Sequence, residues 1–177
     1  MKADDVTLVV GLGKACQTAY QIRRLALTTE PLLPFDNAAS PFGTLITTLY
    51  EDFNNLFQHT AGVLDHDHNF VLGHQPIAQE VLDSWQRRVT RFRDLVESDE
   101  RIMFVRGWRA WNDDEQEDED LLHQALTQYG FKHFLLRYIE MDPYVQGQGN
   151  SWQGNDARWE HELDDVVKAV AKHKRGR

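Results

Sequence analysis

Cys16 is the only cysteine of the chain, and it follows a glycine-rich turn at 11–13. Because a single thiol cannot form an internal disulfide, Cys16 is either a small buried apolar side chain or a reactive one. A helix is expected to begin beside it, and the positive end of the helix dipole favours the thiolate, the form that attacks carbonyl carbons. The backbone amides of residues 13–17, from Gly13 to Gln17, would then stabilise the oxyanion. This pattern predicts nucleophilic chemistry centred on Cys16.

A cysteine nucleophile needs a base, usually a histidine, and a third group that orients this base. Of the eight histidines, His74 follows a short apolar stretch at 70–72 and would face the same edge of a sheet as Cys16, with His68 as the alternative. Asp36 follows two prolines in a constrained loop and would orient the histidine, or would form an ordinary Asx turn. The predicted catalytic set is therefore Cys16, His74 and Asp36.

A metal site is the competing interpretation of the histidine-rich segment, through His66, His68 and His74. Imidazole suits zinc or iron, and a His-x-His on a strand places both rings on one face. The spacing fits no specific metal motif, however, and Cys16 occupies the third glycine position of a dinucleotide-binding loop. We therefore expect no metal or nucleotide cofactor, and a metal-dependent hydrolase is kept as an alternative.

Candidate binding residues follow the second expected strand. Arg106 would hold a carboxylate or an oxyanion, or would pair with a nearby acid. Trp108 and Trp111 would stack on a sugar or a peptide group, or would simply pack. In a non-catalytic alternative, the chain is a carbohydrate- or protein-binding domain that uses these tryptophans, Trp152 and the acidic run at 113–120.

The hydrophobic pattern predicts alternating strands and helices. Strands are expected at 6–10, 102–105 and 131–139, with a further short one near 68–74, and helices at 15–28, 41–56 (capped by Ser40), 77–96, 113–129 and 159–172. Such alternation indicates a single α/β domain over 1–177, with a mainly parallel sheet flanked by helices in three layers and a frayed basic tail at 172–177. Ligands bind beyond the carboxyl ends of such strands, where segments 11–16, 106–111 and 142–155 would gather.

Charge and hydropathy restrict the partners. The 177 residues carry a net charge of −9, which argues against binding to nucleic acids or to acidic membrane surfaces. No apolar run approaches the roughly 20 residues needed to span a bilayer, and the acidic N-terminus is unlike a signal peptide. We therefore expect a cytoplasmic protein that acts on a peptide, an ester or a carbohydrate-containing substrate; the sequence does not specify an oligomeric state.

Five stretches together resemble one known family: GLGKACQTAYQIRR at 11–24, Pro-Phe-Asp at 34–36, Ser-Pro-Phe at 40–42, Arg-Arg-Val-Thr-Arg-Phe at 87–92 and Phe-Val-Arg at 104–106. They are similar to the DUF1796 family of papain-like cysteine peptidases over most of the chain, and most strongly in its first third. The resemblance implies cysteine hydrolase chemistry with Cys16 as the thiol, His74 as the histidine and Asp36 as the acid. It also implies a papain-like α+β fold with an antiparallel sheet, the alternative to the parallel sheet.

The layout is also similar to that of SGNH-type esterases, with Gly-Asn-Asp at 154–156 before the last helix. Those enzymes use a serine and a terminal Asp-x-x-His, whereas this chain has Asp-Ala-Arg-Trp at 156–159. The prediction is a cysteine-dependent hydrolase, peptidase-like or acyl-transferring, with Cys16 as nucleophile. The alternatives are a non-catalytic binding domain, a relative of the SGNH esterases and a metal-dependent hydrolase.

Overall fold

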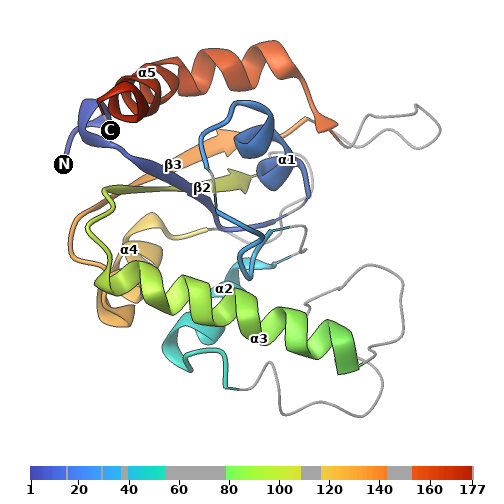
Figure 1. Cartoon of the computed structure of the whole chain (residues 1–177). Coiled ribbons are helices and arrows are strands. Elements are labelled where there is room, and N and C mark those ends of the chain that lie inside the picture. Colours follow the sequence, from blue (N-terminus) through green and yellow to red (C-terminus); the bar gives the residue numbers. More distant parts are fainter. Residues whose placement is uncertain are drawn as a thin grey trace.

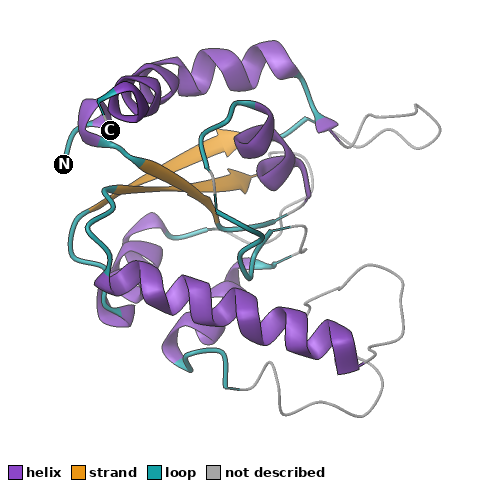
Figure 2. Ribbon diagram, viewed as in Figure 1, coloured by secondary structure: helices purple, strands orange, loops and turns teal. Residues whose placement is uncertain are grey.

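Three parallel strands with helices on both faces organise the computed structural model of the chain (Figures 1 and 2). The structure describes residues 1–14, 16–28, 30–36, 40–54, 79–108, 117–142 and 153–176. The elements in chain order are η1 (Ala3–Asp5), β1 (Leu8–Gly11), α1 (Cys16–Arg24), α2 (Phe42–Tyr50), α3 (Gln79–Asp94), η4 (Leu95–Glu97), β2 (Ile102–Trp108), α4 (Glu119–Tyr129), β3 (Phe134–Glu140) and α5 (Asp156–Arg175).

The sheet order is β1-β2-β3, and both pairings are parallel, with Val10 opposite Phe104 and Phe104 opposite Leu136. The carboxyl ends of the strands therefore meet at one edge, next to α1 (Figure 1). This arrangement confirms the expected α/β class. The antiparallel sheet of the papain-like alternative is wrong for the strands that the structure describes, while the strand expected near 68–74 lies outside the described residues.

Alternating side chains of the strands pack into two hydrophobic clusters. Leu8 and Phe104 belong to the cluster that also contains residues of α2, α3 and α4. Val9 and Met103 belong to the cluster that contains residues of α1 and α5. Figure 2 shows the resulting three layers, with α1 and α5 on one side of the sheet and α2, α3 and α4 on the other. β1 and most of β2 thus bury both of their faces, which explains their largely apolar sequences, whereas most of β3 is only partly buried.

Several predicted helix boundaries shift. α1 ends at Arg24 rather than 28, because Ala26 adopts a φ of +52° that the α-helix does not allow. The helix predicted from 113 is described from Glu119, where the Asp118 side chain caps it by accepting from the Leu121 amide. Gly130 ends this helix at a φ of +128°, as expected for a residue after a helix terminus.

The last helix is longer than predicted at both ends. Asn155 caps α5 by accepting from the amides of Ala157 and Arg158, so the helix begins at Asp156. It continues to Arg175, which corrects the expectation of a frayed tail from 172. Basic residues in the last turn interact favourably with the negative end of the helix dipole, and this stabilises the extension. Among the described residues, no helix combines the length and apolar character needed to cross a membrane.

The ion pair between β3 and α5 should make stability depend on pH. Arg137 donates to both carboxylate oxygens of Asp165, each at 2.8 Å, and this hydrogen bonding lowers the pKa of Asp165. A lowered folded-state pKa stabilises the fold above the unfolded value of about 4, and the contribution is lost as the pH falls further. NMR titration should give Asp165 a lower pKa than in Arg137→Gln, and equal pKa values in both proteins would contradict this assignment.

Candidate functional site

Cys16 is the first residue of α1 and is exposed, just beyond the carboxyl end of β1. The turn before it contains Gly13 and Lys14, whose φ angles are +75° and +76°. A left-handed conformation costs a residue with a Cβ atom about 1–2 kcal/mol, so Lys14 must be held in place. The Ser40 hydroxyl provides such a restraint by accepting a hydrogen bond of 2.9 Å from the Lys14 amide. The sequence left open whether this thiol is buried or accessible, and the structure exposes it.

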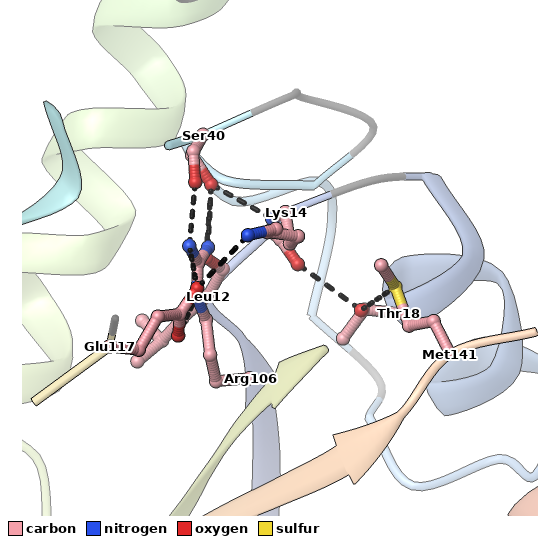
Figure 3. A network of polar contacts seen from close by, with 8 residues as sticks. Leu12, Lys14, Thr18, Ser40, Arg106, Glu117 and Met141 are labelled. Atoms are coloured by element: carbon pink, nitrogen blue, oxygen red, sulfur yellow. Dashed lines mark hydrogen bonds and ion pairs between the residues drawn. The ribbon is translucent and has the colours of Figure 1, made fainter. Parts of the chain in front are cut away.

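Arg106 lies at the centre of a buried polar network beside this turn (Figure 3). Its guanidinium donates to Glu117 Oε2 at 3.1 Å and to Glu117 Oε1 at 2.9 Å. It also donates to the Leu12 carbonyl at 2.8 Å, to Ser40 Oγ at 3.0 Å and to the Ser40 carbonyl at 2.8 Å. The network joins β2 to the turn after β1 and to Ser40, two residues before α2.

These contacts correct two expectations. The Arg106 guanidinium is engaged by protein acceptors and has no exposed surface, so it is not a free anion-binding group. Ser40 does not cap α2; the N-cap residue is Pro41, and the Ser40 hydroxyl serves the network instead. Glu117 was not predicted as the partner of Arg106. An arginine inside the apolar strand at 102–108 nevertheless indicates that a buried acid neutralises it.

Lys14 adds a second cation to this network. Its Nζ lies 3.3 Å from Glu117 Oε1, and both side chains are nearly buried, at 11% and 8% exposure. Glu117 therefore bridges Lys14 and Arg106 (Figure 3). One carboxylate thus connects the turn that precedes Cys16 to the central strand, which restrains the start of α1.

Close packing restrains the first turn of α1 from its other side. Thr18 is fully buried and donates to the Gly13 carbonyl at 3.2 Å. Gly107 of β2 packs so tightly here that a Cβ atom would lie 2.7 Å from Thr18 Oγ1 and 2.4 Å from Met141 Sδ. A residue with a Cβ atom at 107 would therefore force the buried side chains of Thr18 and Met141 to shift.

Two glutamines of α1 connect the helix to the segment around α5. Gln17 is buried and accepts a hydrogen bond of 3.2 Å from the Asp142 amide. Gln21 donates to the Gln153 carbonyl at 2.6 Å and to Asp156 Oδ1 at 2.8 Å. The Gln17 side chain is thus a structural group, and the oxyanion contact of its backbone amide stays a prediction.

Asp36 is buried, but its described partners are not histidines. Its Oδ2 accepts from Arg23 Nη2 at 2.8 Å and from the Leu33 amide at 3.0 Å. A Cβ atom on Gly11 would lie 3.5 Å from Asp36 Oδ1, so the carboxylate is close to the end of β1. Asp36 therefore lies close to this sheet edge, and its pairing with a histidine stays a prediction.

Several predicted site residues lie outside the described part of the chain: His66, His68, His74, Trp111 and Trp152. Trp108 is described, and it is 36% exposed at the end of β2. Among the described residues, no hydrogen bond joins Cys16 to a histidine, and no group of three or more His, Cys, Asp or Glu side chains could hold a metal ion.

Tyr138 of β3 lies opposite Arg106 in the sheet register. Its hydroxyl is buried and has no hydrogen-bond partner within the described ranges of the chain. Burial, and next the negative charge of Glu117, raise the pKa of Tyr138, so this phenol stays protonated at any physiological pH. Its neutral O–H adds no charge to the Arg106–Glu117 network.

A cavity of about 480 Å³ is separate from this edge. It lies among the last turns of α2, α3 and α4, and its lining residues are Leu49, Tyr50, Asp52, Arg93, Asp94, Val96, Glu97, Gln128 and Tyr129. Among the predicted site residues that the structure describes, none contributes to it. We therefore place the candidate site at the carboxyl edge of the sheet, around Cys16.

Comparisons of the chain with protein-family models, with curated proteins and with solved structures give no match. The resemblance to cysteine peptidases therefore stays a prediction. The functional argument rests on the geometry around Cys16.

Proposed function

We propose that the protein is a cysteine-dependent hydrolase or acyltransferase whose nucleophile is Cys16. The observation that carries this proposal is the exposure of the thiol at the first residue of α1, beyond the carboxyl end of a parallel strand. In α/β sheets, ligands bind at this edge. The substrate would be a peptide, an ester or a carbohydrate-containing acyl compound.

The proposed reaction uses the ordinary thiol ester pathway. The Cys16 thiolate attacks the acyl carbon, a C–S bond forms, and the alcohol or amine leaves with a proton. Water, or another acceptor, then attacks the thioester, which releases the acyl group and restores the thiol. The first amides of a helix have no intrahelical acceptor, so those at the start of α1 would stabilise the oxyanion. His74 is proposed as the base and Asp36 as its orienting group.

The restraints on the turn support a role in chemistry, because a nucleophile must be positioned before the substrate binds. The Ser40 hydroxyl accepts a hydrogen bond from the Lys14 amide, and the Thr18 hydroxyl donates one to the Gly13 carbonyl. These two hydrogen bonds restrain the turn before Cys16 and the first turn of α1. An exposed thiol without a function needs no such framework. A chain with one accessible thiol also fits a reducing compartment, and we propose a cytoplasmic location.

Acylation of the protein by p-nitrophenyl acetate tests the proposal, since the lone thiol makes the modified position unambiguous. We expect an acetyl thioester on Cys16 by mass spectrometry, reversed by hydroxylamine and absent from Cys16→Ala. The matched control, Cys16→Ala with Gln86→Cys, moves the thiol to an exposed position within α3. Cys16 should react at least about tenfold faster than the moved thiol, a difference of about 1.4 kcal/mol in activation free energy. Equal rates, or no acylation, would overturn the proposal.

A further inference from the structure

Three arginines from two helices converge on the segment that carries Asp36. Arg23 of α1 donates to Asp36 Oδ2 at 2.8 Å and to the Glu30 carbonyl at 3.0 Å. Arg91 of α3 donates to the Leu32 carbonyl at 2.5 Å. The segment 30–36 thus lies between α1 and α3, with a guanidinium on each side of it.

Arg88 is the third member of this arginine cluster (Arg23, Arg88 and Arg91). It lies one helical turn before Arg91, and its guanidinium carbon is 5.2 Å from the centroid of the Trp85 ring. Burial lowers the pKa of Arg88, Asp36 raises it, and Arg91 and Arg23 lower it further. Its guanidinium therefore lies within electrostatic reach of both other arginines and of the carboxylate.

The described charges of the cluster do not balance. Arg88 interacts with two other cations and with only one carboxylate, in a chain whose net charge is −9. The Nε atoms of Arg23 and Arg91 are also buried and have no hydrogen-bond partner among the residues that the structure describes. Unpartnered buried donors are costly, and guanidinium forks match the oxygens of phosphates and carboxylates. The cluster thus has the excess positive charge, and the guanidinium groups, that favour an anion.

Arg23, the member of the cluster that belongs to α1, lies on the same face of this helix as Cys16. Arg23 follows Cys16 by seven residues, which is almost two full turns and about 10 Å along the axis. Tyr20 lies between them on this face. The thiol is exposed, and Tyr20 and Arg23 are half-buried, whereas the other α1 side chains from 17 to 22 are buried. A ligand lying along this face would reach both the thiol and the arginine cluster.

We propose that the arginine cluster binds an anionic group, a phosphate or a carboxylate, on the acyl compound that Cys16 attacks. The substrate class is thus an acyl donor whose negative charge lies about 10 Å from the reacting carbonyl, as set by seven helical residues. This inference rests on the proposed function for its reaction, but the anion site itself does not need an active thiol.

Binding to Cys16→Ala protein tests the anion site without any chemistry. Calorimetry with inorganic phosphate and with suberate, a dicarboxylate, shows which anion is preferred. Arg88→Gln should raise the dissociation constant at least about tenfold. It should leave the fold intact, because the described contact of Arg88 is with an aromatic ring. Arg87→Gln is the matched control, since Arg87 is the exposed neighbour on the same helix. Binding of neither anion, or equal affinity in both variants, would overturn the anion site.

Acylation of the wild-type chain then separates the two proposals. Mono-p-nitrophenyl suberate and p-nitrophenyl octanoate have acyl chains of equal length, and only the first carries a terminal carboxylate. We expect the suberate ester to acylate Cys16 at least about tenfold faster, a preference that Arg88→Gln should remove and Arg87→Gln should keep. Arg88-dependent anion binding without acylation by either ester would support the anion site and overturn the nucleophile. Equal rates for both esters in every variant would overturn the assignment of this anion to the substrate.

Discussion

Replacing Arg106 by methionine should lower the free energy of unfolding by about 3–5 kcal/mol, the usual cost of removing one partner of a buried ion pair. The substitution leaves Glu117 at 8% exposure without its bidentate donor, and it removes the donors to Leu12 and Ser40. Because Lys14 stays 3.3 Å from Glu117, the loss should lie toward the lower end of this range. Urea denaturation followed by circular dichroism measures it.

A second variant separates the ion pair from simple loss of packing. Adding Glu117→Gln to Arg106→Met removes the uncompensated charge, so the double variant should be less destabilised than the sum of the two single ones. Arg137→Met is the matched control on the neighbouring strand, where the arginine and its partner Asp165 are 26% and 44% exposed. It should cost about 1 kcal/mol or less. Equal losses for Arg106→Met and Arg137→Met would show that the buried network does not stabilise the fold.

Gly154→Ala should destabilise the protein by about 2–4 kcal/mol through backbone strain and overlap together. Gly154 has a φ of +79°, and a Cβ atom would lie 2.4 Å from Gln17 Nε2 and 2.5 Å from its Cδ. The Gln17 side chain cannot simply turn away, since it is buried and accepts from the Asp142 amide. Because Gln17 follows Cys16 directly, alkylation of the thiol by iodoacetamide should also change rate.

Two comparisons test this account of Gly154. In a Gln17→Ala background the overlap is gone, so Gly154→Ala should cost only the strain of its positive φ, about 1–2 kcal/mol. Gly176→Ala is the control at a glycine whose Cβ would meet only ordinary contacts, the nearest being 3.7 Å from the His173 carbonyl oxygen. It should change stability by less than about 0.5 kcal/mol. If Gly154→Ala costs the same with and without Gln17, contact with this side chain is not the cause.

The apolar strand segments and the amphipathic helices were predictable from the sequence, because both depend on the period of neighbouring side chains. The run at 102–105 is buried on both faces and therefore continuously apolar, which is typical of a parallel strand between two helical layers. The same local reasoning placed Cys16 at the start of a helix. The first residues of α4 and α5 differ from the predicted ones by several positions. The side-chain caps Asp118 and Asn155 fix where these helices begin, and the hydrophobic period does not show the position of a cap.

Only the tertiary structure decided what the polar side chains at the sheet edge do. Arg106 hydrogen-bonds Leu12 across 94 positions of the chain and Ser40 across 66, and no local pattern encodes such distant partners. The local sequence predicts Ser40 as a helix cap, but in the structure its hydroxyl accepts a hydrogen bond from Arg106 instead. Because the Arg106 guanidinium is buried, its hydrogen-bond donors need acceptors from the protein and not from solvent. Exposure of Cys16 was undecided for the same reason, because burial depends on which distant segments cover a residue. The sequence by itself thus determined the α/β elements and the position of the thiol at the start of a helix. Packing between remote segments determined the solvent exposure of Cys16 and the hydrogen bonds that restrain the turn before it.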